Sequence, residues 1–153
     1  LVLMILSIGL VGWRTGLWTT ALESAVYIIA TSLILLWYVL FALLASTAAR
    51  AQGPAVAFGV GVWFLFTFLW ALFTTMVAYA SGVAVGEAND PAWIALEGRL
   101  DLLSPNGVYH HLLETQLPTV DRGIPSWQVW LAALGWTVLP WWWLRRRMNN
   151  LVP

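Results

Sequence analysis

Three neighbouring side chains, those of His110, His111 and Glu114, are the residues in this sequence that most resemble site chemistry. On a helix, His110 and Glu114 lie four positions apart and His111 and Glu114 lie three apart, so either pair could share a metal ion. Two or three ligands without further partners are a weak signal, and a surface histidine pair beside a carboxylate explains the same residues. We predict no catalytic residue and no cofactor ligand elsewhere in the chain.

The basic and sulfur-containing residues exclude several other kinds of chemistry. All seven basic residues are arginine, and the 153-residue chain contains neither lysine nor cysteine. A phosphate-binding P-loop of the usual kind, Schiff-base catalysis, a thiolate metal site and a disulfide framework are therefore excluded. The net charge is 0 and the seven basic residues form no cluster beyond one triplet, which argues against a nucleic-acid partner.

Long uncharged segments dominate the chain. Apolar residues make up 61% of the sequence and charged residues 9%, whereas about a quarter of a soluble domain is charged. Residues 51–86 and 123–144 carry no charge, and a bilayer core needs about 20 apolar residues in a helix. The sequence predicts an all-α integral membrane protein.

We expect a single transmembrane domain, residues 1–153, built as a bundle of about four transmembrane helices. Complete spans are expected at about 25–49, 54–80 and 123–144, with Pro140 bending the last one. The apolar run at 1–13 is too short to span, and we interpret it as the outer part of a truncated first span. The complete spans hold no ionisable Asp, Glu, His, Arg or Lys, which disfavours hydrolysis inside the membrane and proton-coupled transport.

The loop at 81–122 is expected to contain two short amphipathic helices. Asp90-Pro91 and Ser104-Pro105 each pair a capping side chain with a proline suited to the first helical position. Apolar residues recur at helical spacing after both signals. We expect these helices to lie on the outer surface of the bundle with their apolar faces toward it.

The arginines indicate the orientation. Alternation of the spans places Arg50, Arg145, Arg146 and Arg147 on one side without any acidic residue, and three arginines with all seven acidic residues on the other. By the positive-inside rule, the first side and the C-terminus are predicted to be cytoplasmic in a multi-pass protein of the cell membrane.

Tryptophans near the expected span ends fit the interfacial preference of indole, but Trp37, Trp63 and Trp70 fall within spans. The plain interpretation is that these three pack between helices or against lipid. The sharper one is that they line a path for a hydrophobic or amphipathic substrate.

Two segments carry a family resemblance. Leu43–Phe64 resembles the junction between the fourth and fifth helices in permease subunits of type-2 ABC exporters, with Ser46, Arg50, Gln52 and Ala55 in the typical places. Leu102–Leu113 resembles the stretch before the last helix of the same family. The resemblance implies the C-terminal half of a six-helix permease.

The resemblance also implies the partners and the energy source. Such permeases lie in the lipid bilayer, pair as homodimers and couple to a separate ABC ATPase subunit, so that ATP binds there and no cofactor binds this chain. Two alternatives stay open: a membrane-bound enzyme using His110, His111 and Glu114 at the surface, and a non-catalytic membrane scaffold. The arginine-only basic set suggests a GC-rich prokaryotic genome.

Overall fold

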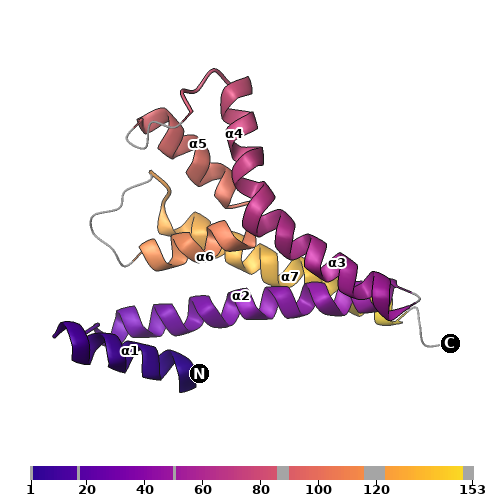
Figure 1. Cartoon of the computed structure of the whole chain (residues 1–153), viewed down its shortest axis with the longest axis horizontal. Coiled ribbons are helices and arrows are strands. Elements are labelled where there is room, and N and C mark those ends of the chain that lie inside the picture. The colour runs from indigo at the N-terminus through magenta and orange to yellow at the C-terminus, as the bar shows by residue number, and fades with distance from the viewer. Residues whose placement is uncertain (1, 17, 50, 86–89, 116–122, 150–153) are drawn as a thin grey trace.

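Every regular element in the described part of the chain is a helix. The computed structural model describes residues 2–16, 18–49, 51–85, 90–115 and 123–149; Arg50, expected as a topology anchor, lies outside these residues. The elements are α1 (Val2–Thr15), α2 (Ala21–Ala48), α3 (Gln52–Phe64), η1 (Leu65–Leu69), α4 (Trp70–Ala80), α5 (Pro91–Asp101), α6 (Pro105–Glu114) and α7 (Ser126–Asn149). The predicted all-α class is confirmed (Figure 1).

Helix α2 begins at Ala21, four residues before the expected boundary, because a capping box precedes it. The Thr20 hydroxyl accepts from the Glu23 backbone N–H at 3.2 Å, and the Glu23 carboxylate accepts from the Thr20 N–H at 2.7 Å. Each contact satisfies a backbone donor that the first turn leaves unpaired. The polar cap thus extends the helix beyond its apolar stretch.

A second long helix runs from Gln52 to Ala80 and contains a π-helical segment in its middle. The segment, η1, interrupts the α-helical hydrogen bonding between α3 and α4 without ending the helix. Among the described helices, α2 and this continuous α3–η1–α4 helix are long and apolar enough to cross a bilayer. The expected number of four spans stays a prediction.

Helix α7 extends to Asn149 and contains Pro140 in its interior. The expected span ended at residue 144, but the helix continues through the arginine triplet. The Arg145 and Arg146 guanidinium groups each lie 5.5 Å from the ring centroid of the tryptophan four residues earlier, Trp141 and Trp142. These cation–π contacts stabilise the extra turn.

Helices α5 and α6 form as predicted. Asp90 and Ser104 are their N-caps, and a proline follows each cap. Val108 and Leu112 on the expected apolar face of α6 are fully buried against α2 and α7, whereas His110 of the same helix is exposed, so α6 contributes one face to the core. In Figure 1, α2 and the α3–η1–α4 helix diverge from their connection, and α5 and α6 occupy the opening between them.

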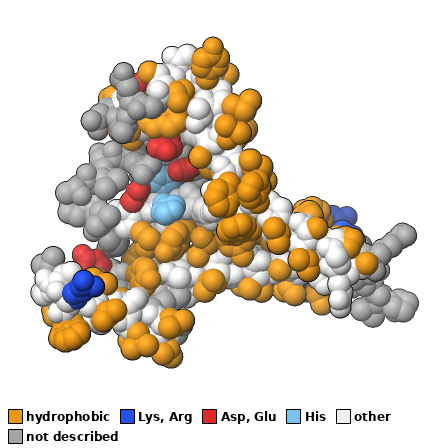
Figure 2. All heavy atoms as spheres, viewed as in Figure 1, with side chains coloured by type: hydrophobic (Ala, Val, Ile, Leu, Met, Phe, Trp, Pro, Cys, Tyr) orange, Lys and Arg blue, Asp and Glu red, His pale blue; other side chains and the backbone are white. Residues whose placement is uncertain are grey.

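The core is small and lies where α2, α6 and α7 meet. Its fully buried members include Ala30 and Trp37 of α2 and Val108 and Leu112 of α6. Elsewhere large apolar side chains are exposed, notably along α3, where no residue is buried (Figure 2). Apolar surface of this extent is unfavourable in water but is compatible with lipid, so the molecule is built as a membrane protein.

Candidate functional site

The half-buried side chain of Asn106 joins three helical elements, α6, α2 and η1. Its Oδ1 accepts a hydrogen bond of 2.8 Å from the Tyr38 hydroxyl of α2. Its Nδ2 donates to the Phe66 carbonyl at 3.2 Å and to the Thr67 hydroxyl at 3.3 Å, both in η1. The amide therefore uses its acceptor and both of its donor hydrogens.

These contacts lie near the middle of both long helices. A π-helical turn alters the regular pairing of backbone carbonyls, and Asn106 supplies a side-chain donor to one of them, that of Phe66. In apolar surroundings an unpaired polar group is costly, so a satisfied junction of this kind fixes the relative positions of its elements. The start of α6 is thereby held against α2 and η1.

Two tryptophans hold the connection between α5 and α6. Trp70 donates from its indole N–H to Asp101 Oδ1 at 3.1 Å, and Trp136 donates to the Leu102 carbonyl at 3.2 Å. The Trp136 ring also packs edge-on against Phe41 and Phe66, with centroid distances of 5.9 and 5.6 Å. The end of α5 and the connection are thus attached to α4 and α7.

The three tryptophans predicted as candidate path residues occupy different environments. Trp37 is fully buried and donates to the Thr137 hydroxyl of α7 at 2.9 Å, so it packs between α2 and α7. Trp70 contacts Asp101, as described above. Trp63 is 46% exposed and packs edge-on against Phe68. A role for these residues in a substrate path stays a prediction.

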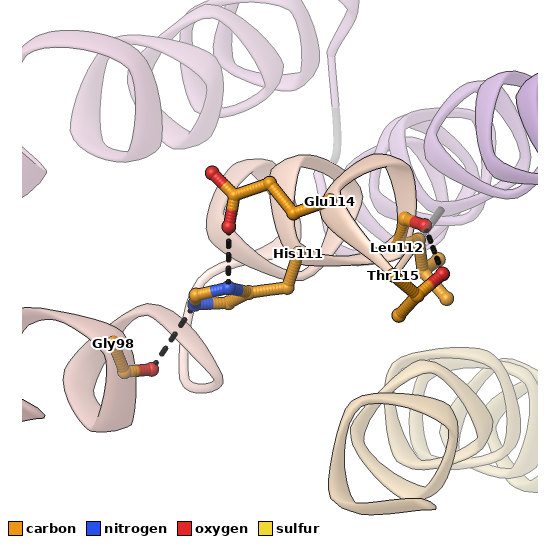
Figure 3. A network of polar contacts seen from close by, with 5 residues as sticks. All are labelled: Gly98, His111, Leu112, Glu114 and Thr115. Atoms are coloured by element: carbon orange, nitrogen blue, oxygen red, sulfur yellow. Dashed lines mark hydrogen bonds and ion pairs between the residues drawn. The ribbon is translucent and has the colours of Figure 1, made fainter. Parts of the chain in front are cut away.

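The histidine pair is divided between two roles. His111 is 4% exposed; its Nδ1 lies 3.2 Å from Glu114 Oε2, and its Nε2 lies 3.2 Å from the Gly98 carbonyl oxygen (Figure 3). Because a carbonyl can only accept, Nε2 carries a proton and donates it to Gly98. His110 is exposed and its ring contacts Tyr109.

His111 therefore tethers α5 to α6, with both of its ring nitrogens engaged. A metal ligand must offer an unprotonated nitrogen, and in this arrangement only Nδ1 could do so, at the expense of its contact with Glu114. Within the described ranges, no three His, Cys, Asp or Glu side chains lie close enough together to hold a metal ion.

An apolar groove of about 960 Å³ lies between α2, α3, η1 and α7. Phe58 and Val62 form part of one wall, and Leu131, Gly135 and Leu139 form part of the wall contributed by α7. Trp127 and Gln128 lie at one end of α7 in this groove, and Trp143 and Arg147 at the other. Its shape and lining suit an elongated apolar molecule.

Sequence reasoning did not find Asn106 or its partners Tyr38 and Thr67. The signal that could have indicated them is an amide directly after a helix-starting Ser-Pro pair, together with a tyrosine and a threonine deep in long apolar runs. Polar groups in such places need partners, and these three satisfy one another.

Comparison with known protein families identifies the family of this chain. A family model described as ABC-2 family transporter protein matches residues 1–142, which include α1 to α6 and most of α7. No curated protein and no solved structure matches the chain. With its long apolar helices and lipid-compatible surface, this chain therefore belongs to the ABC-2 family of transporter membrane proteins.

Proposed function

We propose that this chain is the membrane-spanning permease subunit of an ATP-driven ABC exporter in a prokaryotic cell membrane. The family match over residues 1–142 is the observation that carries the proposal. A separate ABC ATPase subunit binds and hydrolyses ATP, and this chain, paired as a homodimer, provides the transmembrane path. The lack of lysine and of a P-loop supports this division of labour.

The distribution of charge supports an orientation with the α7 C-terminus in the cytoplasm. Arg145, Arg146 and Arg147 lie together in the last turns of α7, and the described acidic residues lie elsewhere, on α2, α5 and α6 and at Asp90 (Figure 2). An arginine-rich helix end favours the cytoplasmic side. The ATPase subunit then binds on the side where α7 ends.

The substrate is proposed to be hydrophobic or amphipathic, lipid-like or drug-like. The groove between α2, α3, η1 and α7 has aromatic and aliphatic walls. The polar side chains of Tyr38 and Thr67, near the middle of the long helices, already pair with Asn106 of α6. Neither feature offers a ligand set for a small hydrated ion, which needs several oxygen donors to replace its water.

The test uses the complete complex in lipid vesicles. The chain is co-expressed and co-purified with candidate ABC ATPases from the same genome, and ATP hydrolysis is measured with a panel of lipid-like, drug-like and inorganic solutes. We expect stimulation by hydrophobic solutes. Failure to form a complex with any ABC ATPase would overturn the function, and stimulation by small inorganic ions alone would overturn the substrate class.

A further inference from the structure

The groove defined above carries a cation at one end. Arg147 lines it together with Trp143, one helical turn earlier, and most of its other lining residues are apolar. Along α7 the groove extends from Trp127 to Arg147, which corresponds to about 30 Å of helix, close to the thickness of a bilayer core. The groove is therefore apolar along most of its length and carries a positive charge at one end.

Arg147 differs from the two arginines before it. Arg145 and Arg146 lie over the Trp141 and Trp142 rings. The Nε of Arg147 donates to the Thr47 carbonyl in the last turn of α2 at 3.3 Å, which fixes the guanidinium at the groove. Among the described residues, no carboxylate forms an ion pair with Arg147.

A cation at the end of an apolar groove complements an anion that carries an apolar chain. We propose that the groove binds an anionic glycerophospholipid, with its phosphate on Arg147 and one acyl chain against α7. One leaflet of the core is about 15 Å deep, so an acyl chain runs beside about ten residues of α7 from Trp143. Gly135 lies on this path and lines the groove.

The open space beside Gly135 allows the acyl-chain position to be tested by filling it with a larger side chain. A Cβ added at Gly135 meets no atom within 4 Å, so the space beside it is open. A leucine there occupies the volume that the acyl chain needs without displacing a neighbour at Cβ. The same is true of Gly9 on α1, which does not line the groove and serves as the matched control.

The experiment measures lipid retention on the full chain in detergent by native mass spectrometry. The probes are palmitoyl-oleoyl phosphatidylglycerol and the corresponding phosphatidylcholine, which differ in net charge. We expect the wild-type chain to bind the phosphatidylglycerol at least fivefold more tightly. Arg147→Gln should remove that preference, and Arg145→Gln should leave it within twofold of the wild type.

The groove itself is tested by Gly135→Leu, which should weaken binding of both lipids severalfold, whereas Gly9→Leu should not. Circular dichroism and size-exclusion chromatography check that each variant folds. If Arg147→Gln does not fold, Arg147→Met replaces it; methionine also removes the charge but keeps a long side chain, so this variant should lose the preference for the anionic lipid.

Three results would overturn the inference: equal binding of the two lipids to the wild type, equal loss in Arg145→Gln and Arg147→Gln, or unchanged binding in Gly135→Leu. Since lipid binding is measured without the ATPase or transport, failure here leaves the proposed function standing. Conversely, a chain that couples to no ATPase can still bind the lipid.

Discussion

Tyr38 and Asn106 are 68 positions apart in the chain and share a hydrogen bond of 2.8 Å in the middle of the helical bundle. The bond brings the start of α6 to the depth of the π-helical segment, where the same amide contacts Phe66 and Thr67. The first turn of α6 thus reaches the middle of both long helices, where the junction is half-buried. If α2 and η1 move relative to each other, the hydrogen bonds of Asn106 to one of them must break.

Replacing Asn106 should destabilise the bundle more than replacing Tyr38. Asn106→Ala removes all three contacts and leaves the Phe66 carbonyl without this donor, whereas Tyr38→Phe removes one donor. We expect losses in the free energy of unfolding of about 1–3 kcal/mol and about 1 kcal/mol, respectively. Unfolding of the detergent-solubilised chain by a denaturing detergent measures both.

The double variant tests whether the two residues act together. Their combined loss should be smaller than the sum of the single losses, because Tyr38→Phe has little left to remove once Asn106 is alanine. Tyr79→Phe is the matched control, since Tyr79 is 83% exposed on α4. Strict additivity, or an equal loss in Tyr79→Phe, would contradict the junction.

Gly107→Ala should disrupt the tight connection between α5 and α6. A Cβ at Gly107 would overlap the backbone and Cβ of Asp101, so α6 must shift away from the end of α5. Overpacking of this kind costs about 1–3 kcal/mol. Thermal unfolding in lipid nanodiscs measures the loss.

Gly59→Ala provides the comparison, because a Cβ at Gly59 in α3 meets no atom within 4 Å. Alanine favours the helix by up to about 1 kcal/mol, so this variant should be neutral or slightly more stable. A tolerated Gly107→Ala would show that the close approach to Asp101 is not needed.

His111 and His110 should respond differently to alanine. His111→Ala removes both contacts of a buried ring, including the one that reaches α5 at Gly98, and should cost about 1–3 kcal/mol. His110→Ala changes an exposed residue and should stay within about 0.5 kcal/mol. Chemical unfolding of the two variants side by side measures the difference.

Adding zinc distinguishes between two roles for His111, a structural contact between α5 and α6 and a metal ligand. Because both nitrogens of His111 are engaged, we expect zinc to leave the unfolding midpoint of the wild-type chain unchanged. A stabilisation by zinc that disappears in both histidine variants would instead favour the metal site considered from the sequence.

Local signals predicted most of the helices, and long-range contacts explain what they missed. Asp90-Pro91 and Ser104-Pro105 marked the starts of α5 and α6 because a cap and a proline act within one turn. The packing of α6 depends on partners in α2, α7 and η1 that lie far away in sequence, and no local pattern indicates them. The π segment has no local signal in the sequence either.

The contacts of His111 also show which partners a sequence can and cannot indicate. Spacing on one helix correctly placed His111 next to Glu114, since positions three apart share a face. The second partner, the Gly98 carbonyl, is a backbone atom on a different helix and leaves no trace in the side-chain pattern. The metal-binding role considered for His111 and Glu114 stays a prediction that the zinc experiment tests.

Single-cysteine labelling should decide the orientation of α7. The chain contains no cysteine, so Met148→Cys, which replaces a residue 53% exposed near the end of α7, introduces a unique thiol. With the arginine triplet in the cytoplasm, a membrane-impermeant maleimide should label this thiol in lysed cells but not in intact cells. Ser81→Cys, at an exposed position just after α4, should already be labelled in intact cells and remain labelled after lysis, because α4 ends on the other side of the membrane in the same arrangement. Labelling of Met148→Cys from outside intact cells would reverse the proposed orientation and move the ATPase-binding side to the other end of the bundle.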